Sequence, residues 1–423
     1  MTFSRIGRIV KGLVASAALG LGMTACGGGT IGYMWVLGTQ PNQTAGIITG
    51  FKIDDYTGNL TAIPGSPFSS VGSNPVSIVV KSGGRFVYVI NKGIPATTTT
   101  AAVAGSISLY SVGGDGTLVY QLSYASQGTT PVWATMDATG TYLYVLDQVA
   151  PSTAYCPVVG TACGDITVFS AAADSGRLTL VLNNSIKLTN TQTQLTYFPV
   201  GIAPTMVKVG SSGCVYSLSS NSIYPYAAGS AGQLTTVATG AMVFNAANAA
   251  AATVNLTSIN TGTTYTYLTD SLNNAIYPLA AGASACSLSA VNPGVVSNLS
   301  LTANPVNSFT SSSGKWLYVI NQSNSANQES TTNSSISAFT IDPTTGRLQE
   351  LADTSNPYST GSGPTCIVGD TSNQYIYTSD SAGLTVTGKL LNQSTGQLTP
   401  LSRGSTFTLK GPPTCLAISG NVN

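Results

Sequence analysis

Polar residues that could perform acid–base chemistry recur at one position of a repeated motif. The motif is a short apolar strand that ends in a small residue, and it occurs seven times. In six copies the last residue is polar: Asn91, Asp147, Ser219, Asp270, Asn321 and Asp380. A carboxylate can act as a general base, so Asp147, Asp270 and Asp380 are the catalytic candidates. The alternative is that each residue caps its own turn through side-chain hydrogen bonds.

Histidine is absent from the sequence, which restricts the chemistry further. Ser-His-Asp catalysis, Cys-His catalysis and His-ligated metal sites are therefore excluded in this chain. Calcium needs several carboxylates that converge on one point, and no Asp-x-Asp-x-Asp run occurs. We expect neither a metal site nor a cofactor. Glu329, in a long predicted loop, is a further carboxylate that could bind a ligand or act as a base.

Aromatic side chains in predicted loops are the other candidate binding groups. Tyr155, Tyr197, Phe198 and Tyr358 could stack on a carbohydrate or hold a peptide. The alternative is that each ring packs its own loop against the fold. Trp133 and Trp316 lie in predicted strands, and we expect them in the core.

Short β-rich segments separated by Gly and Asn turns position these residues. The strongest repeat has predicted strands at 75–80, 85–91 and 105–112 and a fourth that opens at 116–118. We name these strands a, b, c and d. The order recurs from Pro131, Pro204, Pro305 and Pro364, with Gly-x-Leu elements at 176–178, 232–234, 346–348 and 396–398. In the fifth unit, whose first strand is predicted at 253–259, Cys286-Ser287-Leu288 replaces this element.

The two ends of the chain complement each other. The N-terminal part supplies strands b, c and d at 33–37, 47–54 and 60–64, and the C-terminal part supplies a lone strand a at 413–418. One blade built from both ends would close a ring without an open sheet edge. The predicted fold is all-β: a seven-bladed β-propeller of four-stranded antiparallel blades over residues 33–423.

The repeats also resemble a known family. Tyr-Val-Ile-Asn at 88–91 and 318–321 is similar to the Tyr-Val-Thr-Asn repeat of seven-bladed propellers. The segments 54–60, 65–68 and 341–348 resemble the lactonase-type branch, which includes 6-phosphogluconolactonases. The resemblance implies hydrolysis of a sugar lactone. Lactonising enzymes that resemble this fold use His, Glu and Arg in a central cleft, and this sequence cannot supply the His. A phosphorylated lactone would also require clustered Arg or Lys.

Long connections are predicted on one face of the ring. In an antiparallel blade the b–c and d–a loops share a face, and the long ones are 92–104, 148–164, 183–203 and 322–334. Long loops on a rigid scaffold usually carry binding, so we expect a ligand there. The alternative is neutral growth of loops on a tolerant surface.

The N-terminus resembles a bacterial lipoprotein signal. Residues 1–25 are basic and then apolar, and Cys26 is the expected lipidation site, followed by a Gly-rich tether to residue 32. The alternative is an ordinary secretory signal. We expect an exported monomer, anchored to the cell envelope at the outer membrane and facing the periplasm or the surface. Only 7% of the residues are charged, against about 25% in average proteins, and nucleic acid is not an expected partner.

The cysteines agree with export. Cys156 and Cys163 share one loop and are the best candidate disulfide. Cys366 and Cys415 occupy matching positions in consecutive repeats, so we expect them to point the same way and to be buried thiols. Cys214 and Cys286 remain unassigned.

These features favour a binding or scaffold module with a carbohydrate or protein ligand. A lactonase is the alternative, and a purely structural envelope component is the third hypothesis.

Overall fold

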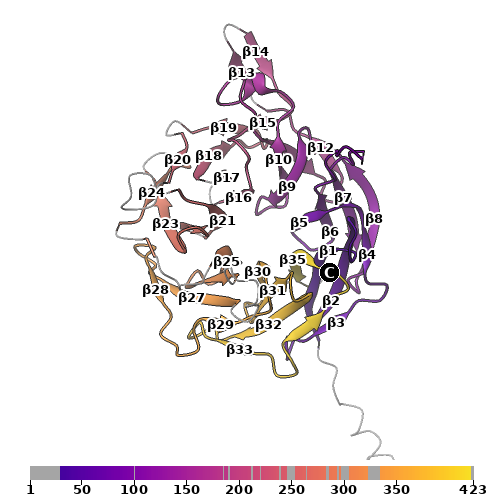
Figure 1. Cartoon of the computed structure of the whole chain (residues 1–423), viewed down its shortest axis with the longest axis vertical. Coiled ribbons are helices and arrows are strands. Elements are labelled where there is room, and N and C mark those ends of the chain that lie inside the picture. Colours follow the sequence, from indigo (N-terminus) through magenta and orange to yellow (C-terminus); the bar gives the residue numbers. More distant parts are fainter. Residues whose placement is uncertain are drawn as a thin grey trace, which may run out of the picture.

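The computed structural model shows seven antiparallel sheets arranged around a central axis (Figure 1). It describes residues 29–420 except 100, 184, 189–190, 211–212, 220, 238–239, 245–252, 263, 283–284, 293–294, 297–303 and 323–333. The predicted all-β seven-bladed propeller is confirmed. These residues include a 3-10 turn, η1 (Thr153–Tyr155), and none of their helices is long and apolar enough to span a bilayer.

Each blade has four strands, a to d from the axis outward. Blade 1 contains β35 (Pro413–Gly420), β1 (Thr30–Thr39), β2 (Ala45–Asp54) and β3 (Leu60–Ala62). Blade 2 contains β5 (Pro75–Val80), β6 (Phe86–Asn91), β7 (Ser106–Val112) and β8 (Leu118–Tyr124). Blade 3 contains β9 (Thr129–Met136), β10 (Tyr142–Val149), β11 (Asp165–Ala171) and β12 (Leu178–Leu180). Blade 4 contains β16 (Met206–Val209), β17 (Cys214–Ser219), β18 (Ser222–Ala228) and β19 (Leu234–Thr236).

The remaining blades follow the same order. Blade 5 contains β21 (Leu256–Thr261), β22 (Tyr265–Asp270), β23 (Ala275–Ala281) and β24 (Leu288–Ala290). Blade 6 contains β25 (Pro305–Thr310), β26 (Trp316–Asn321), β27 (Ser335–Ile341) and β28 (Leu348–Glu350). Blade 7 contains β30 (Pro364–Gly369), β31 (Tyr375–Asp380), β32 (Thr385–Leu391) and β33 (Leu398–Pro400).

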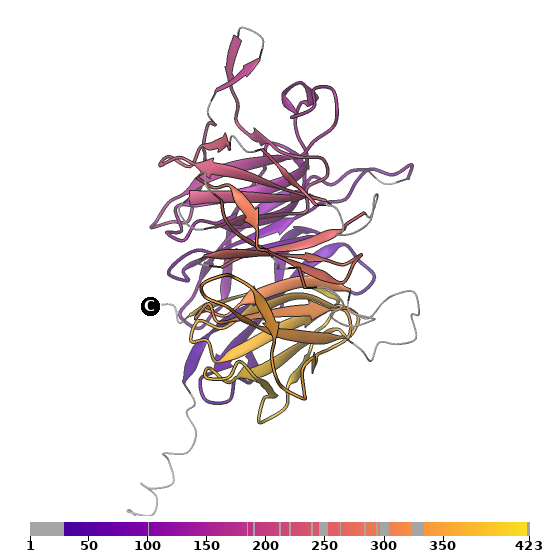
Figure 2. The same ribbon diagram turned by 90° about the vertical axis from the view of Figure 1, so that its left-hand side faces the viewer.

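Short strands from the d–a connections add to this frame. They pair with strand c in blades 1, 3, 4, 6 and 7: β4 (Phe68–Ser73), β15 (Phe198–Pro199), β20 (Met242–Val243), β29 (Tyr358–Ser359) and β34 (Thr406–Thr408). A separate hairpin, β13 (Ser185–Leu188) with β14 (Thr191–Gln194), projects from the ring between β12 and β15 (Figures 1 and 2).

The ring closes as the sequence predicts. β1 pairs with β35 from Gly32 opposite Gly420 to Gly38 opposite Pro413, so one blade is built from both ends of the chain. The Oγ1 atom of Thr414 also donates to the carbonyl of Pro75 at 2.7 Å, which ties the closing strand to blade 2. The closed ring leaves no sheet edge at the joint.

Strand b carries the core because both of its faces are covered. All six residues of β6 are buried. Tyr88 and Ile90 pack toward blade 3, whereas Val87 and Val89 pack toward blade 1. An apolar run without polar alternation is therefore what this position requires.

The aromatic residue of strand b donates a hydrogen bond to the Gly-x-Leu turn of the next blade. The hydroxyl of Tyr318 in β26 donates to the carbonyl of Gly396, in the c–d turn of blade 7, at 2.7 Å. Gly396 has φ +78°, and a Cβ there would lie 2.5 Å from Cδ1 of Trp316. We call this arrangement the aromatic–glycine clasp. The same donor–acceptor contact joins Trp35 to Gly116, Tyr88 to Gly176, Tyr267 to Gly346 and Tyr377 to Gly58.

A disulfide replaces the clasp between blades 4 and 5. Cys214 stands at the strand position that Trp316 occupies in blade 6, and Cys286 stands at the glycine position with φ +61°. The two residues are joined, with Cα atoms 5.1 Å apart. The degenerate fifth unit thus keeps its inter-blade contact in covalent form.

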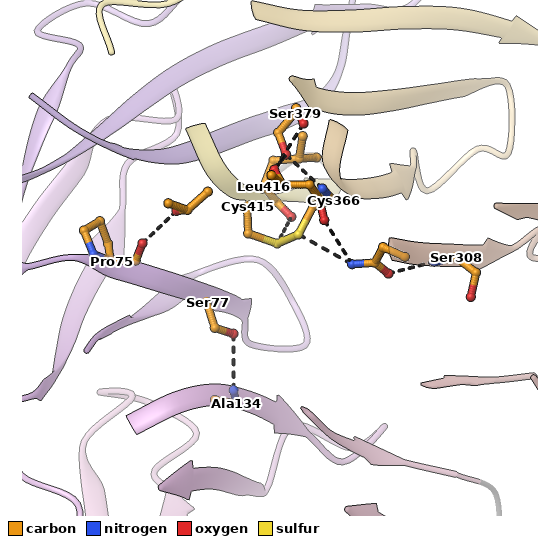
Figure 3. The surroundings of a disulfide bond; sticks show 11 residues. Pro75, Ser77, Ala134, Ser308, Cys366, Ser379, Cys415 and Leu416 are labelled. Atoms are coloured by element: carbon orange, nitrogen blue, oxygen red, sulfur yellow. Dashed lines mark hydrogen bonds between the residues drawn. A yellow bond between two sulfur atoms is a disulfide. The ribbon is translucent and has the colours of Figure 1, made fainter. Parts of the chain in front are cut away.

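The expectation that Cys366 and Cys415 are free thiols is wrong. The structure joins them by a disulfide with Cα atoms 5.1 Å apart (Figure 3). Both lie on strands a of neighbouring blades, β30 and β35. The innermost strands of a propeller converge on the axis, so matching positions come within bonding distance. Cys156 and Cys163, the pair expected from their common loop, are also joined.

Several sequence-based predictions lie outside the described residues. They are the signal segment 1–25, the lipidation site Cys26 and the candidate Glu329.

Candidate functional site

The carboxylates singled out from the sequence are buried framework. Asp270 and Asp380 have no exposed surface. Asp270 accepts hydrogen bonds from three backbone amides, of Asn255, Leu272 and Asn273, at 2.9 to 3.3 Å. This is the capping alternative. The side chains of Asn273 and Tyr277 donate to the other carboxylate oxygen at 2.6 and 3.1 Å, so neither oxygen faces a ligand.

Asp380 is held by hydroxyl groups instead of amides. Its carboxylate accepts from Thr378 at 2.9 Å and from Thr387 at 2.7 Å. Burial raises the pKa of Asp380 to about 6, although these hydrogen bonds lower it. Asp147 also has no exposed surface. The three catalytic candidates are therefore inaccessible to a substrate in this structure.

The aromatic candidates are mostly core residues. Tyr197, Phe198 and Tyr358 are buried, and Tyr155 in η1 is half-buried. The ring of Phe198 packs edge-on against Tyr226 with centroids 5.0 Å apart. The hydroxyl of Tyr358 donates to Asp353 at 2.7 Å. These rings hold the d–a segments against strand c, so Tyr197, Phe198 and Tyr358 cannot stack on a ligand.

A cavity lies at the centre of the ring, where the innermost strands of the blades face one another. It has a volume of 790 Å³ and is lined by strand a residues of all seven blades. Blade 4 contributes Lys208. At one end it is lined by a–b turn residues, among them Ser82, Asp137, Gly262 and Ser312. No lining residue in the described ranges comes from a b–c or d–a loop. The cavity thus lies toward the face opposite the long loops.

Lys208 is the one basic side chain among the described residues that line this cavity. It comes from β16, and its ammonium lies 5.5 Å from the ring centroid of Trp133 in β9. Desolvation lowers the pKa of Lys208, because burial disfavours the charged amine. Trp133 is half-buried in the cavity wall, not fully in the core as expected. A lysine of this kind can act as a base or can stabilise a developing negative charge.

Amide and hydroxyl groups surround the rest of the cavity. The Oγ1 atom of Thr310 donates to Oδ1 of Asn260 at 3.0 Å. Asn307 donates weakly to the carbonyl of Thr365 at 3.4 Å and accepts from the backbone amide of Ser308. Figure 3 shows this wall, where the Oγ atom of Ser77 accepts from the amide of Ala134 at 3.2 Å. Hydrogen-bonding groups of both kinds suit a polyhydroxylated ligand.

The cavity residues were not predicted from the sequence, although one of them is a charged residue within an apolar strand. Lys208 interrupts an otherwise apolar strand, Met206–Val209, at a position that the propeller fold turns toward the axis. Asn260 and Asn307 lie in β21 and β25, which also carry Ser and Thr, so they stand out less. These residues do not recur from blade to blade, so a search for repeats passes over them.

The sequence of this chain matches the model of one protein family. The family model of lactonases with a seven-bladed β-propeller matches residues 45–187 and 214–416. This chain belongs to the lactonase family. No curated protein sequence is significantly similar to it.

Solved structures show the same fold. The periplasmic gluconolactonase of Pseudomonas aeruginosa is 14% identical, with a TM-score of 0.67 over 92% of this chain and 99% of that one. A Bacteroides fragilis protein provisionally assigned as a 6-phosphogluconolactonase is 17% identical, with a TM-score of 0.66 over 93% and 99%. A Lactobacillus plantarum protein is 15% identical, with a TM-score of 0.65 over 92% and 100%.

Proposed function

We propose that this protein hydrolyses an uncharged sugar lactone in its central cavity. The observation that carries the proposal is Lys208, a desolvated amine beside Trp133 in the wall of a polar cavity of a lactonase-family propeller. The sequence alone favoured a binding scaffold, but the family match supports the lactonase alternative better.

The chemistry needs one group that both accepts and returns a proton. The neutral amine of Lys208 would take a proton from a water molecule as its oxygen attacks the lactone carbonyl. The tetrahedral oxyanion then collapses, the ring C–O bond breaks, and the ammonium returns the proton to the departing alkoxide. The product is a hydroxy acid, which loses its carboxyl proton to solvent. Desolvation against Trp133 supports this role, because it raises the fraction of neutral amine at a given pH.

The charge of the cavity favours a lactone without phosphate. A phosphate usually requires several cationic donors, often bidentate arginines. The described lining contains Lys208 as its one basic residue and Asp137 at the turn end. The name of the Pseudomonas aeruginosa gluconolactonase is in keeping with a nonphosphorylated substrate.

The test is the initial rate of proton release with glucono-lactone, corrected for spontaneous hydrolysis. Replacing Lys208 by methionine should lower the rate about 10²- to 10⁴-fold, the range for loss of a general acid–base group. Lys315→Met is the matched control, because Lys315 also lies over a tryptophan, at 5.9 Å from Trp316, but outside the cavity. An unchanged rate in Lys208→Met would refute the assignment.

The pH profile separates a base from a mere positive charge. In the wild type the rate should rise with pH along a limb below about 10.4, the ordinary lysine pKa. Lys208→Arg keeps the charge but cannot deprotonate near neutral pH, so this limb should disappear. If glucono-lactone binds without turnover, the binding or scaffold function would be favoured instead.

We also propose that the protein is exported and held at the envelope by a lipid on Cys26, as its N-terminal sequence suggests. The three disulfides support export, since such bonds persist mainly in oxidising compartments. Membrane partition of the wild type that persists in Cys26→Ser would refute the lipid anchor.

A further inference from the structure

Blade 3 contains two buried acids that face each other. Asp147 lies two residues before the end of β10, Asp165 begins β11, and the two are directly paired across the strands. Neither side chain has exposed surface. In blades 2, 6 and 7 the residue opposite the end of strand b is a hydroxyl residue: Ser106, Ser335 and Thr385. Like charges opposite each other destabilise a sheet, so the acid pair requires an explanation.

Among the described residues, one oxygen of each carboxyl group has no hydrogen-bond partner. The hydroxyl of Ser126 donates to Oδ1 of Asp147 at 2.7 Å, and Thr167 donates weakly to Oδ2 of Asp165 at 3.4 Å. Oδ2 of Asp147 and Oδ1 of Asp165 are buried without a hydrogen bond in the described part of the chain. A proton held between these two oxygens would satisfy both, as either carboxyl can be the donor when it is protonated.

The surroundings exclude water and supply no positive charge. A Cβ on Gly128 would lie 2.7 Å from Cβ of Asp147 and closer still to Oδ1 of Asp165, so the backbone at Gly128 covers the pair. Neighbouring strands β9 and β15 carry no titratable side chain. The charged or titratable groups that face the pair within the described residues are the two acids themselves and Tyr197, with Tyr155 beyond it.

We propose that Asp147 and Asp165 share one proton, and that this proton fastens the base of the projecting hairpin to blade 3. The contacts at that base converge on the pair. Asp165 pairs with Pro199 of β15, and the backbone amide of Gln127 donates to Thr167 at 2.9 Å. The Oγ1 atom of Thr196 donates to Gln127 at 2.7 Å, which joins the two covering segments. The β13–β14 hairpin extends from this segment (Figure 2).

The pH dependence follows from burial and mutual repulsion. Burial raises the pKa of both carboxyls, and the charge of Asp147 raises the pKa of Asp165 further. A folded-state pKa above the unfolded value stabilises the fold at low pH, and this contribution is lost as pH rises through the folded-state pKa. Deprotonation would leave two negative charges in a dry site and loosen the segments that cover it.

The experiment measures proton release on unfolding and local hydrogen exchange. Near neutral pH, wild type should release about one proton more on unfolding than Asp165→Asn, whose amide can donate to Asp147 without a shared proton. The infrared band of a protonated carboxyl should be present in wild type and weaker in Asp165→Asn. Amide exchange at residues 125–128 and 195–198, corrected for intrinsic rates, should rise with pH in wild type only.

Asp380→Asn is the matched control, since Asp380 ends strand b of blade 7 but is surrounded by hydroxyls rather than by a second acid. It should leave the amide exchange at residues 125–128 and 195–198 unchanged. Equal proton release by wild type and Asp165→Asn would overturn the proposal. So would a rise in the melting temperature of wild type on adding Ca²⁺, reversed by EDTA and absent in Asp165→Asn, because a cation would then occupy the pair.

Discussion

The aromatic–glycine clasp predicts a large loss of stability from one methyl group. In Gly396→Ala the new Cβ meets two separate obstacles. The backbone has φ +78°, and Cδ1 of Trp316 lies 2.5 Å from the Cβ position. Trp316 is only 4% exposed and is packed within the core between blades 6 and 7, so it cannot swing away freely.

The magnitude follows from these two terms. A left-handed backbone costs a non-glycine residue about 1–2 kcal/mol, and overpacking a core costs about 1–3 kcal/mol. Alanine also lowers the conformational entropy of the unfolded chain relative to glycine, which stabilises the folded state by about 0.4–1 kcal/mol. We therefore expect the free energy of unfolding to fall by about 1–5 kcal/mol in Gly396→Ala, centred near 3 kcal/mol.

Two glycines of the same chain separate the terms in urea unfolding at equilibrium. Gly404 has φ +99° and no atom within 4 Å of its Cβ position, so Gly404→Ala tests the backbone term alone. Gly114 also has open space and no positive φ, so Gly114→Ala should be neutral or slightly stabilising. If Gly396→Ala loses no more stability than Gly404→Ala, contact with Trp316 does not explain the glycine.

Two further predictions concern the inter-blade disulfides. Replacing Cys366 and Cys415 by serine removes a disulfide with a sequence separation of 49. Loop entropy predicts that the free energy of unfolding in urea falls by about 4 kcal/mol. A fall below about 1 kcal/mol would contradict a role in ring closure. The double variant Cys214→Tyr with Cys286→Gly rebuilds an aromatic–glycine clasp between blades 4 and 5. It should therefore unfold at a higher urea concentration than the variant with alanine at both positions. Equal urea midpoints would show that the disulfide does not replace the clasp.

The sequence predicted the architecture because the repeat encodes it locally. Every blade needs a strand b buried on both faces, and five blades also pair an aromatic donor on this strand with a glycine in the next c–d turn. These requirements recur at fixed positions, as in Tyr318 and Gly396, so pattern alone gives blade number and strand order. Ring closure was predictable too, because the unpaired ends supplied complementary strands.

The candidate site could not be predicted in the same way. The recurrent acids Asp270 and Asp380 attracted attention because they repeat, and they repeat because they are framework. Lys208 and Trp133 are single departures from the pattern on neighbouring strands. Their 5.5 Å approach depends on the convergence of strands a at the axis, which no local pattern reports.

What the sequence determined by itself was therefore everything set by neighbours along the chain: alternation, turns, blade count and the absence of histidine chemistry. The tertiary structure decided what depends on distances across blades. It joined Cys366 to Cys415, buried Asp147 opposite Asp165, and placed Lys208 in the wall of the central cavity. The physical reason is that the radial geometry of the ring, and not the strand pattern, sets which side chains of separate blades meet.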